Sequence, residues 1–224
     1  PYLGNDQHRG YPVMEKQNLG EIIEEIHVKG QRVLVHTNGD AAIDDVLDAI
    51  EAAQKSTPRE DARHLLIHCQ TVREDQLDRM QALGVHPNFF VLHIYYWGER
   101  HENIFLGSKR AKRLNPIASA MDKGLVATIH CDIPIVPLTP LLAVQTAVTR
   151  KTYQGNTLGP QQRVCIWDAL KMYTISAAWQ FSEEKNKGSI ERGKLADFVI
   201  LESNPLTCDP DRIKDIKVLE TIVA

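Results

Sequence analysis

The sequence is poor in cysteine, and its four cysteines have no regular spacing. They are Cys69, Cys131, Cys165 and Cys208 among 224 residues, and no two of them form a C-x-x-C motif. A small disulfide-stabilised fold and a zinc knuckle both need closely spaced cysteines, so neither is expected. We predict reduced thiols in a cytoplasmic protein. A signal peptide upstream of Pro1 stays open, because the sequence does not begin with methionine.

An excess of charge of one sign and a long apolar run are also missing. Lys and Arg total 26, Asp and Glu total 29, and the net charge is -3. The longest basic cluster, 109–113, is typical of a solvated helix face, so no nucleic-acid partner is expected. No apolar run approaches the ~18 residues that a membrane helix needs, so no membrane partner is expected. With 43% apolar residues, the composition is that of an ordinary globular protein.

The motifs of covalent and phosphate chemistry are absent as well. The sequence contains no G-x-S-x-G elbow that would present a nucleophilic serine, and no glycine-rich phosphate loop. Cys69 and Cys131 are most simply small residues of buried strands. Nothing therefore nominates a serine or cysteine nucleophile.

What the sequence does contain is an alternation of short apolar runs and amphipathic helices. Runs typical of buried strands occupy residues 33–36, 65–68, 85–94 and 125–129. Helical patterns occupy residues 21–29, 41–55, 74–83 and 109–123, and Asp40 is the expected N-cap of the second. The aromatic-rich segment after residue 94 is expected to be a long loop. The repeat predicts an α/β fold with a parallel sheet.

The C-terminal part has a different pattern. Residues 165–181 are predicted to be helical, and two short β segments follow at 198–201 and 218–223. This pattern indicates a small β appendage. The predicted domains are therefore 1–186 and 187–224.

Residues able to bind a metal follow three of the apolar runs directly. His36 ends the run VLVH, His68 ends the run LLIH, and Asp132 follows the run VATIHC. In an α/β barrel, catalytic groups sit where the strands end, so these side chains are expected at one mouth. Two histidines and an aspartate are a plausible ligand set for a zinc-like ion. Taken alone, a histidine at a strand end is more often a structural residue.

Longer motifs around these residues resemble the amidohydrolase superfamily, and more narrowly its N-acyl and N-substituted formamide hydrolases. The motifs are HTNGDAAI (36–43), RHLLIHCQ (63–70), HCDIPIVP (130–137) and GSIERGKLADFVIL (188–201). The resemblance implies the C-terminal half of a (β/α)8 TIM-type barrel, strands five to eight, together with part of a small β-sandwich domain.

The same resemblance implies the composition of the metal site. Members of the superfamily take ligands from an H-x-H pair on strand one, a lysine or acid on strand four, histidines on strands five and six, and an aspartate on strand eight. Matched by motif, His36 falls on strand five, His68 on strand six and Asp132 on strand eight. The sequence contains no H-x-H, so the remaining ligands are expected upstream. One or two divalent ions are implied, zinc first, with iron or manganese as alternatives.

The resemblance also implies hydrolysis of a non-peptide C–N bond in a small amide or formamide. A divalent ion lowers the pKa of bound water toward ~7 and polarises the carbonyl that is attacked. Asp132 is the expected catalytic base that takes the water proton and passes it to the leaving amine. A cyclic amidase or a deaminase of the same superfamily stays open as an alternative.

Substrate contacts are expected from the aromatic segment that follows the third apolar run. We predict that His93 and Trp97 bind the substrate, with a buried aromatic cluster as the alternative. For His130, a structural or supporting role is favoured over a ligand role.

A second hypothesis is an inactive folded fragment or association module. The open edges of half a barrel would then pair with another copy, as a homo-oligomer, or with the missing N-terminal half.

Overall fold

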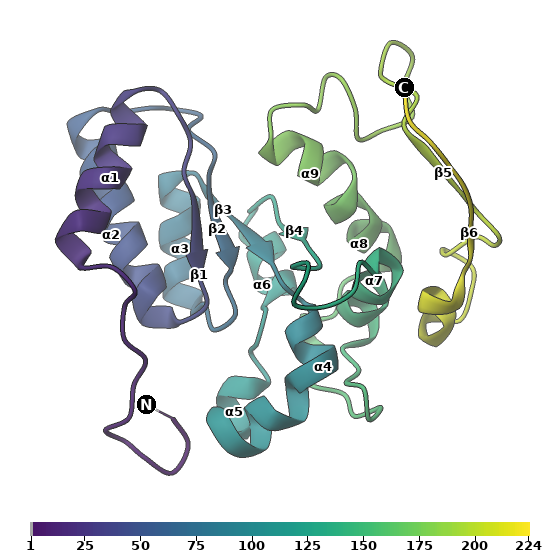
Figure 1. Ribbon diagram of the computed structural model, residues 1–224, viewed down its shortest axis with the longest axis horizontal. Helices are drawn as coiled ribbons and strands as arrows, with labels where there is room; N and C mark the ends of the chain where they lie inside the picture. Colours follow the sequence, from purple (N-terminus) through teal and green to yellow (C-terminus); the bar gives the residue numbers. More distant parts are fainter. Residues whose placement is uncertain (1) are drawn as a thin grey trace.

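A four-stranded parallel sheet forms the centre of the computed structural model, which describes residues 2–224 (Figure 1). The strands are adjacent in chain order and are β1 (Leu34–Thr37), β2 (His64–His68), β3 (Val85–Phe89) and β4 (Thr128–Ile129). The predicted α/β fold with a parallel sheet is confirmed.

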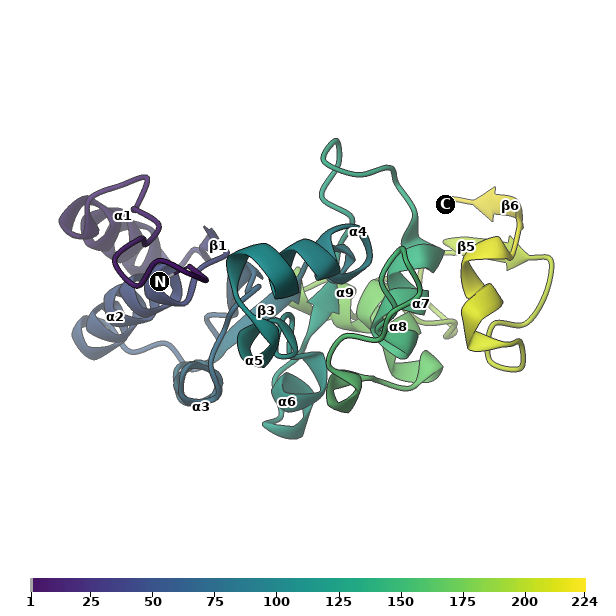
Figure 2. The same cartoon turned by 90° about the horizontal axis from the view of Figure 1, so that it is seen from below.

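Helices connect the strands and continue beyond the sheet. They are α1 (Lys16–Val28), α2 (Asp40–Ser56), α3 (Glu74–Leu83), α4 (Leu92–Arg100), α5 (Ser108–Ala111), α6 (Ile117–Asp122), α7 (Pro140–Thr149), α8 (Ile166–Tyr173) and α9 (Ile175–Gln180). Figure 2 shows these elements laid out roughly in chain order, from α1 at one end to the C-terminal strands at the other.

Helix α2 illustrates why these segments fold as they do. Its buried residues recur at helical spacing and are Ile43, Val46, Leu47, Ile50 and Ala53. All of them except Ala53 belong to one hydrophobic core that also contains residues of β2 and β3. Burial of this apolar stripe, more than intrinsic helix propensity, stabilises a surface helix of this length.

Strands β1 and β2 differ in burial because β1 lies at the edge of the sheet. Leu65 and Leu66 in β2 are fully buried, whereas Leu34 in β1 is 46% exposed. An edge strand also leaves one row of backbone groups without a sheet partner.

Two predictions about the segment after β3 are wrong. The strand predicted over 85–94 ends at Phe89, and the predicted loop that follows is α4, continued by a π-helical turn over His101–Phe105. Ile94 and Gly98 lie four residues apart and are both buried. The burial of this helix face outweighs the strand preference of a segment rich in aromatic and β-branched residues.

Two predicted helices are each divided. The segment 109–123 forms α5 and α6, separated around Pro116, which cannot donate a backbone hydrogen bond in a helix interior. The segment 165–181 forms α8 and α9, separated at Thr174, which has a non-helical φ of -120° and ψ of -101°. Helix α7 has no counterpart among the predicted helices.

The two predicted C-terminal β segments are strands, and they pair with each other. Strands β5 (Phe198–Leu201) and β6 (Val218–Ile222) form a two-stranded antiparallel sheet. All residues of β6 are exposed. The division into domains 1–186 and 187–224 stays a prediction. Among the helices of residues 2–224, none is both long and apolar enough to cross a bilayer.

Candidate metal centre

The carboxyl ends of the four strands lie at one edge of the sheet. The register places Thr37 beside His68, His68 beside Phe89, and Phe89 beside Ile129. The residues that follow these strand ends therefore lie at the same edge of the sheet. A cavity of about 490 Å³ lies there and is lined by His36, Asn38, His68, Gln70, Phe90, His93, Trp97, Arg100, His101, Phe105, Asp132 and Ile135.

Three side chains in this region converge closely. One ligand atom from each of His68, His130 and Asp132 lies within 4.8 Å of the other two. The ring of His36 is next to this group, with its centroid 4.4 Å from that of His68. The structure thus brings the three predicted ligands to one cavity and adds His130 to them. The ligand set itself stays a prediction.

The backbone has unusual conformations at two of these positions. His68 has a φ of 77° and Asp132 a φ of 55°, both in the left-handed region that non-glycine residues seldom adopt. Such conformations cost free energy and are enriched at functional sites. His68 is the last residue of β2, and Asp132 lies three residues after the end of β4.

His130 is held by a neighbouring strand and by an aromatic ring. Its Nδ1 donates to Asn88 Oδ1, which can only accept, so Nε2 keeps its lone pair. That Nε2 is buried and has no hydrogen-bond partner among the described residues. The ring stacks on Phe90, with centroids 5.4 Å apart and an interplanar angle of 21°. Burial, and then the neighbouring His68, lower the pKa of His130 to about 3.

His68 is in a similar state. Its Nδ1 is buried and has no hydrogen-bond partner within residues 2–224. Burial lowers its pKa, His36 lowers it further, and Asp132 opposes the shift. Both rings are therefore neutral at neutral pH, which is the form of imidazole that binds a metal.

The donor set fits a divalent ion. Two neutral imidazole rings converge with one carboxylate, and each ring has a buried nitrogen without a hydrogen-bond partner among the described residues. Nitrogen and oxygen ligands of this kind suit zinc. The exposed His36 adds a further nitrogen nearby, although its Nε2 accepts a hydrogen bond of 3.1 Å from Asn38 Nδ2.

The two predicted substrate residues also line the cavity. His93 and Trp97 lie one helical turn apart on α4, and their ring centroids are 6.3 Å apart. The centroid of His93 is 5.9 Å from that of His68. Burial, followed by the repulsion of neighbouring histidines, holds the pKa of His93 well below its usual value. Their role in substrate binding stays a prediction.

The sequence motifs did not single out Gln70 or His101. Gln70 Nε2 donates to His101 Nε2 over 2.8 Å, and both residues line the cavity. Gln70 follows the second strand-end histidine by two positions, so the spacing carried a weak signal. His101 begins the π-helical turn, and a turn of this kind has no recognisable sequence pattern.

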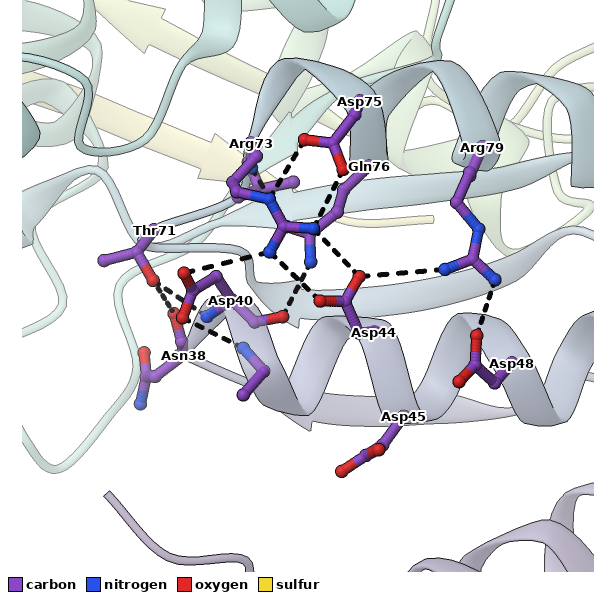
Figure 3. Close-up of polar contacts among 12 residues, drawn as sticks. Asn38, Asp40, Asp44, Asp45, Asp48, Thr71, Arg73, Asp75, Gln76 and Arg79 are labelled. Atoms are coloured by element: carbon purple, nitrogen blue, oxygen red, sulfur yellow. Dashed lines mark hydrogen bonds and ion pairs between the residues drawn. The ribbon is translucent and has the colours of Figure 1, made fainter. Parts of the chain in front are cut away.

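Hydrogen bonds and ion pairs fix the loops beside the cavity (Figure 3). Thr71 Oγ1 donates to Asn38 O and accepts from Asp40 N, which joins the loops after β1 and β2. Arg73 then joins the following helices by contacting Asp44 and Asp75. Asp40 is the first residue of α2 and not its N-cap, which is Gly39. The prediction of Asp40 as the N-cap is thus wrong by one position.

The sequence matches known proteins along its whole length. The profile of the Amidohydrolase family matches residues 1–224. YtcJ of Bacillus subtilis (strain 168), which is named as an amidohydrolase, is 30% identical over 230 residues covering 100% of this chain and 42% of that protein. The N-substituted formamide deformylase of Arthrobacter pascens is 30% identical over 225 residues covering 98% of this chain and 40% of that protein.

Solved structures agree with these matches. An uncharacterised metal-dependent hydrolase from Pyrococcus horikoshii OT3 superimposes with a TM-score of 0.80 and 28% identity, covering 94% of this chain and 42% of that one. A second such hydrolase, from Pyrococcus furiosus, gives a TM-score of 0.77 and 30% identity, covering 92% and 41%. The chain thus spans about two fifths of the length of these relatives. Because the family profile matches residues 1–224, the chain belongs to the amidohydrolase family.

Proposed function

We propose that this chain supplies part of the active site of a metal-dependent hydrolase that cleaves non-peptide C–N bonds in small amides or formamides. The observation that carries the proposal is the convergence of His68, His130 and Asp132, with buried ring nitrogens that lack other partners. The 30% identity to a protein named as a formamide deformylase supports the choice of bond.

We also propose that the chain forms half of a barrel. Four parallel strands with an open edge at β1 would be strands five to eight of a (β/α)8 barrel, with the first four strands contributed from outside this chain. The exposed Leu34 on β1 and the share of the relatives that is covered support this view. Pairing with that other half is then the proposed partner interaction, and a homo-oligomer is the alternative.

The residues have distinct proposed roles. His36, His68 and His130 would hold one or two divalent ions, zinc first, together with Asp132 and ligands from the other half. A bound ion of this kind supplies an activated water and polarises a carbonyl. The Asp132 carboxylate takes the proton of the attacking water and gives it to the leaving nitrogen as the C–N bond breaks. His93 orients the amide, and Trp97 packs against its apolar part.

The experiment compares the zinc-loaded full-length protein with its Asp132→Asn variant. We expect zinc bound to the wild type and hydrolysis of formanilide or acetanilide, with aniline as the product. The variant keeps the shape of the side chain but cannot take a proton, so its kcat should fall at least ~100-fold. Zinc content is measured separately, so that loss of the ion is distinguished from loss of the base.

Other outcomes favour other functions. Full-length protein that binds no zinc and hydrolyses no amide would support the inactive fragment or association module. Turnover of cyclic amides, or release of ammonia from amino-substituted rings, without cleavage of either anilide would support the cyclic amidase or deaminase.

We also place the protein in the cytoplasm. All four cysteines are free thiols, and two of them, Cys69 and Cys131, are buried. Thiols in this state suit a reducing compartment.

A further inference from the structure

The cavity beside the candidate metal centre has a single basic side chain of fixed charge. Arg100, the last residue of α4, lines the cavity, and the other lining residues include neither lysine nor a second arginine. No carboxylate in residues 2–224 lies within 4.0 Å of its guanidinium, and its side chain makes no hydrogen bond to them. By contrast, Arg63, Arg73 and Arg79 are all engaged in ion pairs.

A local irregularity shapes the cavity next to Arg100. Helix α4 passes directly into the π-helical turn, which brings both His101 and Phe105 into the cavity wall with ring centroids 5.7 Å apart. Turns of this type are rare and are frequent at functional sites. The turn is anchored from outside by Leu3 N, which donates to Phe105 O over 2.8 Å.

Ring contacts connect this region to the candidate metal centre. The centroid of His93 lies 5.9 Å from that of His68 and 6.1 Å from that of His101. His93 thus lies close to both His68 and His101, and Arg100, which precedes His101 in the chain, lines the same cavity as Asp132.

Part of the cavity wall is apolar. Phe90, Trp97, Phe105 and Ile135 contribute to it, and Ile135 is 62% exposed. Two neighbours of Ile135 on the same segment, Ile133 and Leu138, are also large, apolar and exposed. Apolar surface at the mouth of a cavity is stabilised when a ligand covers it.

We propose that the substrate is an amide with an aromatic body and a carboxylate at the end remote from the scissile bond, and that Arg100 binds this carboxylate. The planar guanidinium matches a carboxylate with two parallel hydrogen bonds, and the apolar wall accommodates the ring between the two polar ends. This inference rests on the proposed hydrolase, because it defines the substrate class of that same site.

Two probes that differ only in the carboxylate test the proposal. They are N-(2-phenylethyl)formamide and 4-(2-formamidoethyl)benzoate. Calorimetry on the metal-free full-length protein measures binding without turnover. We expect the carboxylate probe to bind about tenfold more tightly than the neutral probe, because a charge-assisted hydrogen bond has roughly this effect at an accessible site.

Variants assign the preference to Arg100. Arg100→Gln should reduce the preference to less than about twofold, and Arg100→Lys should keep part of it, because the ammonium retains the charge but not the fork geometry. Arg192→Gln is the control, since Arg192 is exposed and does not line the cavity. With zinc bound, Arg100→Gln should raise KM for the carboxylate probe and leave kcat nearly unchanged.

Equal binding of the two probes, no binding of either, or a preference that survives Arg100→Gln would overturn the inference. Failure of the proposed hydrolase looks different. The zinc-loaded protein would then hydrolyse neither probe, while the metal-free protein would still prefer the carboxylate and lose that preference in Arg100→Gln. In that case the assignment of Arg100 as an anion-binding residue stands without the reaction.

Discussion

Acid should destabilise this fold through a pair of buried histidines, His64 at the start of β2 and its neighbour His27. Val33 N donates to His64 Nδ1 over 3.0 Å, so the proton of that ring is on Nε2, which donates to His27 Nδ1 over 2.8 Å. His27 Nε2 then donates to Thr57 O over 2.7 Å. Both rings are fully buried. A second proton on His64 would place Nδ1–H against the N–H of Val33.

The size of the effect follows from the pKa of His64. Burial, then the charges of His27, Arg59 and Arg32, lower this pKa from 6.5 to about 4. The unfolded chain therefore binds this proton at higher pH than the folded chain does. The stability is present above pH ~6.5 and is lost as the pH falls toward ~4. The limiting loss is about 3 kcal/mol, and the loss between pH 7 and pH 5 is about 2 kcal/mol.

The assay is urea unfolding of the metal-free protein, followed by circular dichroism at pH 7 and pH 5. Other histidines also titrate in this range, so the wild type is compared with His64→Gln. The variant should lose about 2 kcal/mol less than the wild type between the two pH values. His8→Gln, a change in an exposed ring, should behave as the wild type does.

An equal pH-dependent loss in the wild type and in His64→Gln would refute this reasoning. If the variant does not fold, the carbon-bound ring protons of His64 can be followed by NMR in the wild type. Protonation of that ring in the folded state above pH ~5.5 would refute it as well.

Further predictions concern backbone and ligand positions. Gly159→Ala should cost more than ~2 kcal/mol, because its Cβ would overlap the backbone oxygen of Lys112. Gly155→Ala, also at positive φ but in open space, should cost ~1 kcal/mol in urea unfolding. Arg150→Met should lower the free energy of unfolding by at least ~3 kcal/mol, because the buried guanidinium donates to three backbone carbonyls. Arg150→Lys should lower it less than Arg150→Met does. His130→Gln should weaken zinc binding at least ~10-fold in equilibrium dialysis, and His86→Gln should not.

Local patterns in the sequence predicted the parallel strands and the convergence of their ends. His68 and Asp132 each follow an apolar run, and parallel strands necessarily open at one edge. This reasoning needs only the periodicity of the apolar residues and the order of the strands along the chain. It also placed His36 beside the cavity, although that residue lies on an exposed edge strand.

Features that depend on tertiary contacts could not be predicted in this way. Helix α4 resembles a strand in composition, and its helical conformation follows from the burial of Ile94 and Gly98. The hydrogen bond between Gln70 and His101 joins residues 31 positions apart through a π-helical turn. His130 has the spacing of a structural strand residue. It becomes a candidate ligand because Asn88 occupies Nδ1 and leaves Nε2 without a partner among the described residues.

The left-handed backbone at Asp132 has a consequence for the evolution of this protein. A glycine there would relieve about 1 kcal/mol of conformational strain. This gain should offset part of the stability that Asp132→Gly loses with the side-chain contacts, as measured by urea unfolding. The backbone conformation alone therefore does not favour an aspartate at this position. Its retention in a thermostable homologue would mean that catalysis, and not folding, maintains the residue.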